Sequence, residues 1–203
     1  AGGSVPVLEW LLARGALDAD HLCTHAARYG QLAALQWLHE RGITGDETTC
    51  NTAARRGDLP TLQWLRAQNT PWTEPDIAID AAYSGNVAML AWLQSAVATP
   101  WDAQCLQMML VEAGEGGHLE AAKWLRAIGA PWPPAFWQVA PPPLSTMVGW
   151  QLATLQWARR EGCPWGDWNS MVCELVYGMQ PDVVDWAHKN GCPCECPRDA
   201  IIA

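Results

Sequence analysis

Two kinds of residue are scarce in this chain of 203 residues. It contains a single Phe and three Tyr, and its 12 Lys and Arg face 21 Asp and Glu, which gives a formal net charge of −9. Proteins that bind nucleic acid neutralise phosphates with basic side chains, so this charge balance argues against nucleic-acid binding. An acidic chain also gains no attraction to an anionic membrane surface.

Long apolar runs and the common catalytic motifs are missing too. No apolar run approaches the roughly 18–20 residues that a membrane-spanning helix requires, so we expect no direct membrane span. The sequence has no phosphate-binding loop, no His-Glu-x-x-His motif and no Gly-x-Ser-x-Gly motif. We therefore expect neither enzymatic activity nor a cofactor.

The eight cysteines lack the spacing of a disulfide framework. Several recur at equivalent repeat positions, such as Cys23 and Cys50. This pattern favours reduced thiols that pack as small apolar side chains. Reduced thiols in turn indicate an intracellular reducing compartment, although the sequence does not say which one.

Tryptophan, by contrast, occurs 14 times, and seven copies recur in similar phrases at intervals of 27, 27, 28, 32, 33 and 29 residues. The seven are Trp10, Trp37, Trp64, Trp92, Trp124, Trp157 and Trp186. Such a recurrence is typical of an array in which each unit buries its apolar face against its neighbours. We predict one array over residues 1–203, with about six repeats and partial units at its ends, and these tryptophans in its core.

Each repeat is predicted to fold as two short helices, which we call helix A and helix B. Helix A carries small residues at i, i+3 and i+4, such as Cys23, Ala26 and Ala27. It ends at a Gly such as Gly57, because Gly adopts the left-handed conformation that follows many helices. Helix B carries the recurring Trp and ends at another Gly or, in one repeat, at Asn69. A Pro-Trp dipeptide then marks the connector to the next repeat.

The shared phrase Ala-Ala-x-x-Gly-x-Leu-x-x-Leu-x-Trp-Leu-x-x-x-Gly resembles the two-helix part of the ankyrin repeat. The chain is similar to a tryptophan-rich, Cys-Pro-Trp variant of that repeat over nearly its whole length. The resemblance implies an all-α fold, an ankyrin-type helical solenoid. The family's Thr-Pro-Leu-His start of helix A is absent, and the shortest periods fall below the family's period of about 33 residues. The missing residues belong to the connector, so we expect shortened connectors and no projecting β-hairpin fingers.

Two regions depart from the repeat. Residues 131–143 read PWPPAFWQVAPPP, which cannot form a regular helix because of the prolines. We expect an inserted loop there, with Phe136 and Trp137 as candidates for partner contacts. The array also begins in mid-repeat and ends as another unit starts, so we expect a piece of a longer protein; degenerate terminal caps are the alternative.

A repeat array leaves a long surface that usually binds something, so we predict a scaffold for protein–protein interaction. The register of helix A places a set of polar and aromatic residues opposite its small face, on the expected concave surface. The set is His25, Arg28, Tyr29, Thr52, Arg55, Arg56, Asp80 and Tyr83. Arg together with Tyr is typical of interfaces and here favours an acidic partner, although a solvated face gives the same pattern.

The connector tryptophans allow two interpretations. They are Trp72, Trp101, Trp132 and Trp165. They can form a ladder of rings over the junctions between repeats, or an exposed row that grips a partner, because Trp is enriched among interface hot spots. We include them among the candidates for partner binding. Two alternatives to a free scaffold also stay open: a permanent accessory subunit of a large multiprotein assembly, and the recognition arm of a longer protein.

The cysteines near the C-terminus are weak candidates for a metal site. Three of them lie close together in sequence: Cys192, Cys194 and Cys196. A fourth ligand would come from Cys163, Cys173 or His188. Zinc sites, however, usually leave about two to four residues between neighbouring cysteines, and Cys192 matches Cys163 in the repeat. We therefore expect no metal in this protein.

Overall fold

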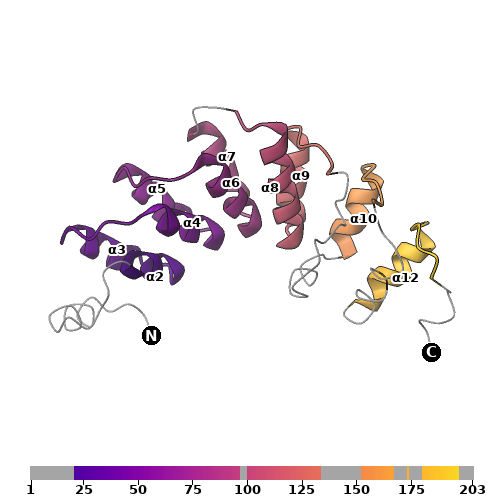
Figure 1. The fold of residues 1–203 in the computed structure, drawn as a ribbon, viewed down its shortest axis with the longest axis horizontal. Helices are drawn as coiled ribbons and strands as arrows, with labels where there is room; N and C mark the ends of the chain where they lie inside the picture. Colours follow the sequence, from indigo (N-terminus) through magenta and orange to yellow (C-terminus); the bar gives the residue numbers. More distant parts are fainter. Residues whose placement is uncertain (1–20, 97–99, 134–151, 167–172, 174–179, 197–203) are drawn as a thin grey trace. The chain divides into compact units, whose positions relative to one another are not determined.

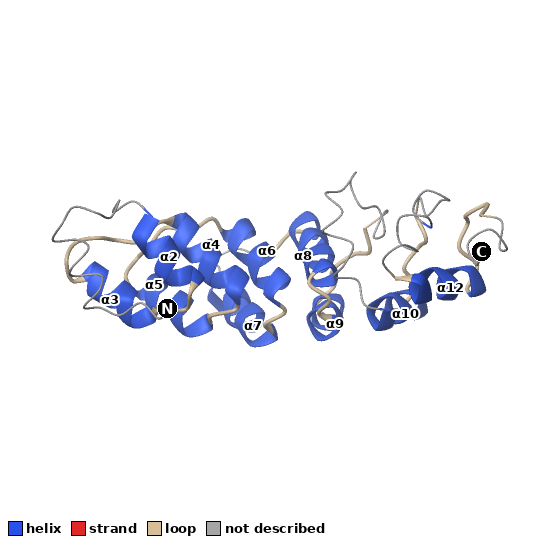
Figure 2. Ribbon diagram, turned by 90° about the horizontal axis from the view of Figure 1, so that it is seen from below, coloured by secondary structure: helices blue, strands red, loops and turns tan. Residues whose placement is uncertain are grey.

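The computed structural model describes residues 21–96, 100–133, 152–166, 173 and 180–196, and every regular element in these residues is a helix (Figures 1 and 2). The helices are α2 (Leu22–Arg28), α3 (Leu32–His39), α4 (Glu47–Arg56), α5 (Leu59–Ala67), α6 (Glu74–Ser84), α7 (Val87–Ala96), α8 (Ala103–Glu115), α9 (Leu119–Ala127), α10 (Leu152–Arg160) and α12 (Pro181–Lys189). The described chain is therefore all-α, as predicted. Among these helices, none combines the length and the apolar character that a membrane crossing requires.

Two compact units make up the chain, residues 1–105 and 106–203, and the boundary between them falls inside α8. In the first unit, α2 packs on α3, α4 on α5 and α6 on α7, and α4 also packs on both α2 and α6 (Figure 2). These pairs correspond to the predicted helices A and B. The division does not test the single array predicted for residues 1–203, because an array whose repeats contact only their neighbours can be divided between any two of them.

Left-handed residues follow the helices where the sequence predicts them. Gly57 after α4 has a φ of 76°, which lets the backbone N–H of Asp58 donate to the carbonyl of Ala53 at 3.0 Å. Asn69 has a φ of 59° and is the one described residue other than Gly with a positive φ. Asp58 then caps α5 by accepting hydrogen bonds from the backbone N–H and the hydroxyl of Thr61. Helix A thus passes into helix B within two or three residues.

Small side chains on helix A and larger ones on helix B form the core. The predicted small face is buried in each repeat of the first unit, for example at Cys50, Ala53 and Ala54. On α5, Leu62 and Leu65 are buried against it. Of the recurring tryptophans, Trp37 and Trp157 are buried, and Trp64, Trp92, Trp124 and Trp186 are half-buried. Small residues let neighbouring helices approach closely, and the indoles then cover the outer part of each pair.

Side-chain hydrogen bonds also join neighbouring repeats of the first unit, between residues nearly one repeat apart. The amide of Asn86 donates to the carbonyl of Gly57 at 2.9 Å. The hydroxyl of Thr73 donates to the carboxylate of Glu47. The carbonyls at the end of a helix have no partner within it, so a donor from the next repeat satisfies one and fixes how the two repeats align.

Candidate functional site

The predicted partner surface of the first unit begins at the end of α2. His25, Arg28 and Tyr29 are all exposed there, and Tyr29 leaves 65% of its surface in contact with solvent. Among the described residues, the two large apolar side chains that are exposed are Tyr29 and Met108. An exposed aromatic ring next to an exposed guanidinium is a pairing that protein interfaces favour.

Arg55 of α4 lies on the same surface but is held by the next repeat. Its guanidinium forms an ion pair with Asp80 of α6 at 2.9 Å, and lies 3.7 Å from the centroid of the Tyr83 ring. The side chain of Arg55 is half exposed, whereas that of Asp80 is mostly covered. Arg55, Asp80 and Tyr83 therefore join α4 to α6. Thr52, another predicted site residue on α4, is half-buried.

Arg56 makes the corresponding contact toward the preceding repeat. Its guanidinium donates to the carbonyl of Arg28 at 3.1 Å. It also lies against Gly30, where a Cβ would come within 2.8 Å of the guanidinium nitrogens. A charge reversal at Arg55 or Arg56 would therefore disturb the packing of neighbouring repeats as well as the binding of any partner. Arg28 and Tyr29 offer the cleaner test of binding.

The connector tryptophans are half-buried. Three of them pack against the helix-B tryptophan of the next repeat, with ring centroids 6.0, 5.5 and 5.8 Å apart; the pairs are Trp72–Trp92, Trp132–Trp157 and Trp165–Trp186. All described tryptophans are buried or half-buried, which favours the interpretation as a ladder over the junctions. Phe136 and Trp137 lie outside the described residues.

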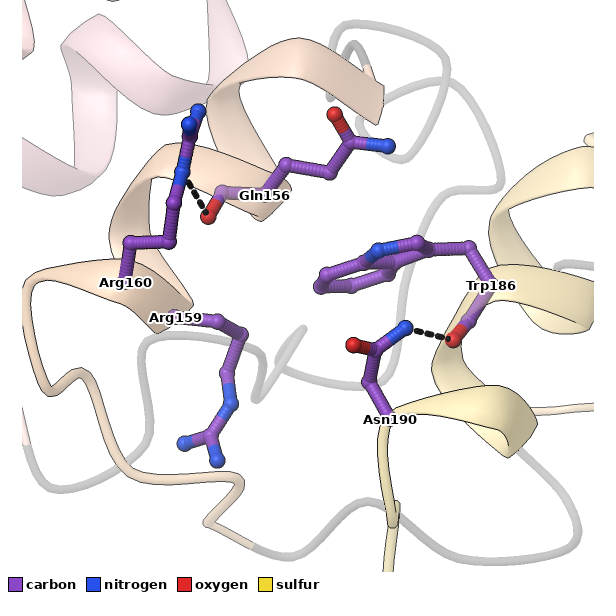
Figure 3. Close-up of a pocket in the computed structure, with 5 residues that line it drawn as sticks. All are labelled: Gln156, Arg159, Arg160, Trp186 and Asn190. Carbon is purple, nitrogen blue, oxygen red and sulfur yellow. Dashed lines mark hydrogen bonds between the residues drawn. The ribbon is translucent and has the colours of Figure 1, made fainter.

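A pocket of about 370 Å³ lies between α10 and α12 in the second unit (Figure 3). Its lining residues are Gln156, Arg159, Arg160, Trp186 and Asn190. The ring of Trp186 and the side chain of Gln156 reach toward each other from the two helices. The described residues that line it offer two cations but no carboxylate, thiol or imidazole, so these residues lack the pair of groups that acid–base catalysis uses. No motif marks these residues in the sequence, because the pocket exists only where two repeats meet.

Cysteines at the repeat positions are buried thiols, as predicted. Cys23, Cys50 and Cys163 are all buried, and no described cysteine forms a disulfide. Burial raises the pKa of the Cys50 thiol to about 12, with a further contribution from the carboxylate of Asp46. Burial also raises the pKa of Cys163 to about 12, although nearby arginines act against it.

We expect Cys50 and Cys163 to resist alkylation in the native protein at pH 8. With a pKa of about 12, only about one thiol in ten thousand is ionised at that pH, and the thiolate is the form that reacts. Iodoacetamide labelling followed by peptide mass spectrometry measures this directly. Labelling in guanidinium serves as the control and should modify all eight cysteines. Rapid modification of Cys50 in the native protein would contradict its buried position.

The remaining cysteines group differently from the set that the sequence put forward. Cys163 packs in the core and its thiol donates to the carbonyl of Pro164 at 3.6 Å, so it is no ligand candidate. One group of described residues brings potential ligand atoms within 4.8 Å of one another. It consists of Cys173, His188, Cys192 and Cys194. Two of the three alternative fourth ligands, Cys173 and His188, thus join the group together, and Cys196 does not belong to it.

Two thiols of this group differ in acidity. Burial raises the pKa of Cys192 to about 12. At Cys194, burial also acts to raise the pKa, but hydrogen bonds with the thiols of Cys192 and Cys173 outweigh it, so the pKa of Cys194 is lowered overall. Of these two thiols, Cys194 is therefore the one that ionises first.

The described residues offer four candidate groups: the exposed residues at the end of α2, the connector tryptophans, the pocket between α10 and α12, and the group of three thiols and one imidazole. No protein-family model matches the sequence, and no curated protein is similar enough to match it. The residues themselves are accordingly the basis for the function proposed below.

Proposed function

We propose that this protein is an ankyrin-type helical solenoid with shortened connectors, and that it is a scaffold that binds other proteins. The helix pairs α2–α3, α4–α5 and α6–α7 support the proposed fold because they repeat one arrangement. A left-handed Gly separates the two helices of each pair: Gly30, Gly57 and Gly85. Stacked pairs of this kind present the ends of consecutive A helices on one continuous surface, which suits the docking of a partner.

The observation that carries the proposed function is the exposure of Tyr29 beside Arg28. A Tyr with 65% of its surface exposed contributes nothing to the core, whereas it offers a large, rigid contact area to a partner. Arg and Tyr are enriched among the residues that dominate binding energy. His25, one helical turn before Arg28 and Tyr29, extends the same exposed patch.

Charge indicates what kind of partner this surface accepts. The whole chain carries a formal net charge of −9, yet Arg28, Arg55 and Arg56 gather around the ends of α2 and α4. The one described carboxylate that pairs with them is that of Asp80, which neutralises Arg55. A local positive surface on an acidic protein attracts an acidic surface or segment of another protein.

We propose a different role for the connector tryptophans, which the sequence also put forward for binding. The rings of three of them pack against the tryptophan of the next helix B, so they would set the spacing between repeats instead of contacting the partner. A permanent accessory subunit would need exposed apolar side chains, such as tryptophans, because obligate interfaces are more apolar. Since the described tryptophans are buried or half-buried, we keep the docking of an acidic partner as the single proposal.

Photo-crosslinking tests this proposal. A benzoylphenylalanine at position 29 keeps the aromatic character of Tyr29, and one at Gln63, an exposed residue of helix B, serves as the matched control. In cells that express the protein, we expect position 29 to form one defined adduct and position 63 to form none. The adduct should disappear when Arg28→Glu is added. Equal adducts at both positions, or an adduct that Arg28→Glu leaves intact, would refute the proposal.

A further inference from the structure

Three sulfurs and one imidazole nitrogen meet near the end of α12. The Sγ of Cys173 lies 3.5 Å from the Nε2 of His188, and the Sγ atoms of Cys192 and Cys194 are 3.0 Å apart. All four ligand atoms fall within 4.8 Å of one another. Three thiolates with one imidazole form a ligand set that structural zinc sites use, because Zn²⁺ prefers sulfur and nitrogen donors.

Two distances within this group lie within about 1 Å of those that a tetrahedral zinc ion imposes. Zn–S and Zn–N bonds of about 2.3 and 2.0 Å hold a sulfur and a nitrogen about 3.5 Å apart, and two sulfurs about 3.8 Å apart. The separation of Cys173 and His188 already has this value. The sulfurs of Cys192 and Cys194 would have to move apart by less than about 1 Å, which rotation about their side-chain bonds supplies.

Other repeats of the chain carry a stacked Arg–Trp pair at the positions that His188 and Cys194 occupy. In three earlier repeats, an Arg in helix B and a Trp six residues later stack, with 4.6, 4.5 and 4.6 Å between the guanidinium carbon and the ring centroid. The pairs are Arg66–Trp72, Arg126–Trp132 and Arg159–Trp165. In the repeat that contains α12, the same two positions carry His188 and Cys194. Both partners of a stacking pair are thus replaced together, and both by residues that bind zinc.

The backbone after α12 explains why the two C-terminal sulfurs reach His188. Gly191 has a φ of 76°, and the N–H of Cys192 donates to the carbonyl of Ala187 at 3.1 Å. The chain therefore folds back over the last turn of the helix, as it does after α3, α5, α9 and α10. This turn carries Cys192 and then Cys194 toward the side of α12 on which His188 lies.

The position of Cys192 alone would not require a metal, because Cys163 holds the same place in its own repeat and is simply buried. The two differ in their neighbours. Cys163 faces a carbonyl, whereas the sulfur of Cys192 faces a second thiol, with a third thiol and an imidazole within 4.8 Å. A group of this composition can coordinate a metal ion, whereas the single buried cysteine cannot.

We propose that Cys173, His188, Cys192 and Cys194 bind one Zn²⁺ ion. Four protein ligands fill the tetrahedron and leave no position for water, so the site is structural and not catalytic. On binding, the three thiols release their protons to solvent, and the neutral imidazole binds through Nε2. The ion would fasten the segment that contains Cys173 to the end of α12, at a place where the earlier repeats use an Arg–Trp pair.

A cobalt titration of the complete chain tests the site. The protein is stripped of metal and kept reduced, and Co²⁺ is added as the probe, followed by Zn²⁺. We expect one equivalent of Co²⁺ to produce the visible absorption of tetrahedral, thiolate-bound cobalt. One equivalent of Zn²⁺ should then displace it, because zinc binds such ligands more tightly. Absence of that spectrum at one equivalent would overturn the proposal.

Variants locate the ligands. Cys194→Ser, and the double variant His188→Arg with Cys194→Trp, should each weaken metal binding at least roughly 100-fold, because even second-shell changes cost 10–100-fold. The double variant restores the stacking pair of the earlier repeats, so its fold should be kept, which circular dichroism verifies. Cys196→Ser and Cys163→Ala are the controls and should bind as the unmodified protein does; Ala130 already holds the position of Cys163 in its repeat. Loss of binding in Cys196→Ser, or binding retained in Cys194→Ser, would assign the ion elsewhere and overturn this site.

Discussion

Replacing Trp157 with alanine is expected to lower the free energy of unfolding of the second unit by about 3–5 kcal/mol, the range for a buried aromatic side chain. Trp157 of α10 leaves only 9% of its surface exposed. Its ring packs against that of Trp132, with 5.5 Å between the ring centroids. Removing the indole leaves a cavity and also removes the surface on which Trp132 rests. The stacking of Arg126 on Trp132 and the hydrogen bond from the Nε1 of Trp132 to the carbonyl of Glu161 would remain.

Denaturation in urea followed by circular dichroism measures this loss without depending on tryptophan fluorescence. Gln156→Ala is the matched control, because Gln156 precedes Trp157 on the same helix and is only half-buried. Its expected effect is within about 0.5 kcal/mol, as for most substitutions away from the core. A loss below about 1 kcal/mol in Trp157→Ala would mean that the indole is not part of the core. The helix-B tryptophans would then be available for binding.

Helix pairs and their ends could be predicted because their signals are local. Gly57 and Asn69 follow helices with positive φ values, since few other residues adopt that conformation readily. Pro60 and Pro181 lie at the starts of α5 and α12, where a missing N–H costs no hydrogen bond. Each of these assignments depends on a few neighbouring residues and on the period of the repeat. None requires knowledge of how one repeat rests on the next.

Contacts between repeats could not be predicted in the same way. The sequence predicted Arg55 as a partner-binding residue on the concave surface, and its side chain is half exposed, but the sequence did not predict that Asp80 and Tyr83 hold its guanidinium. That contact joins residues 25 positions apart in sequence and depends on how α4 and α6 align. The pattern within one helix therefore predicts which residues point outward, but not which of them contact side chains of the next repeat.

The thiol and imidazole group shows the same limit. Closeness in sequence favoured Cys196, whereas Cys173, nineteen positions before Cys192, is the residue that joins the group. The turn at Gly191 decides which sulfurs face the helix, and the spacing of the cysteines in the sequence does not reveal that orientation. One signal was nevertheless present in the sequence. When the repeats are aligned, His188 and Cys194 occupy the positions of an Arg and a Trp elsewhere.

Arg28→Glu combined with Tyr29→Ala is expected to weaken binding of the acidic partner about 100-fold or more. Hot-spot residues cost about 2 kcal/mol or more each when removed, and about 1.4 kcal/mol corresponds to a tenfold change in affinity. Both residues are exposed, so the free energy of unfolding should change by no more than about 0.5 kcal/mol. Calorimetric titration with the partner identified by crosslinking measures the affinity, and denaturation in urea measures the stability.

A second pair of substitutions separates binding from the packing of repeats. Arg55→Gln with Asp80→Asn removes the ion pair between α4 and α6, and should lower stability by less than about 1 kcal/mol because Arg55 is half exposed. If Arg28 and Tyr29 form the contact, this pair should leave the affinity within a few-fold of its original value, and the affinity of the unmodified protein should fall as salt increases. If the Arg55 and Asp80 variant loses affinity as strongly as the Arg28 and Tyr29 variant, the partner binds to a surface that depends on how α4 and α6 pack, and not to the patch at the end of α2 alone. A fully retained affinity in Arg28→Glu/Tyr29→Ala would exclude that patch from the interface.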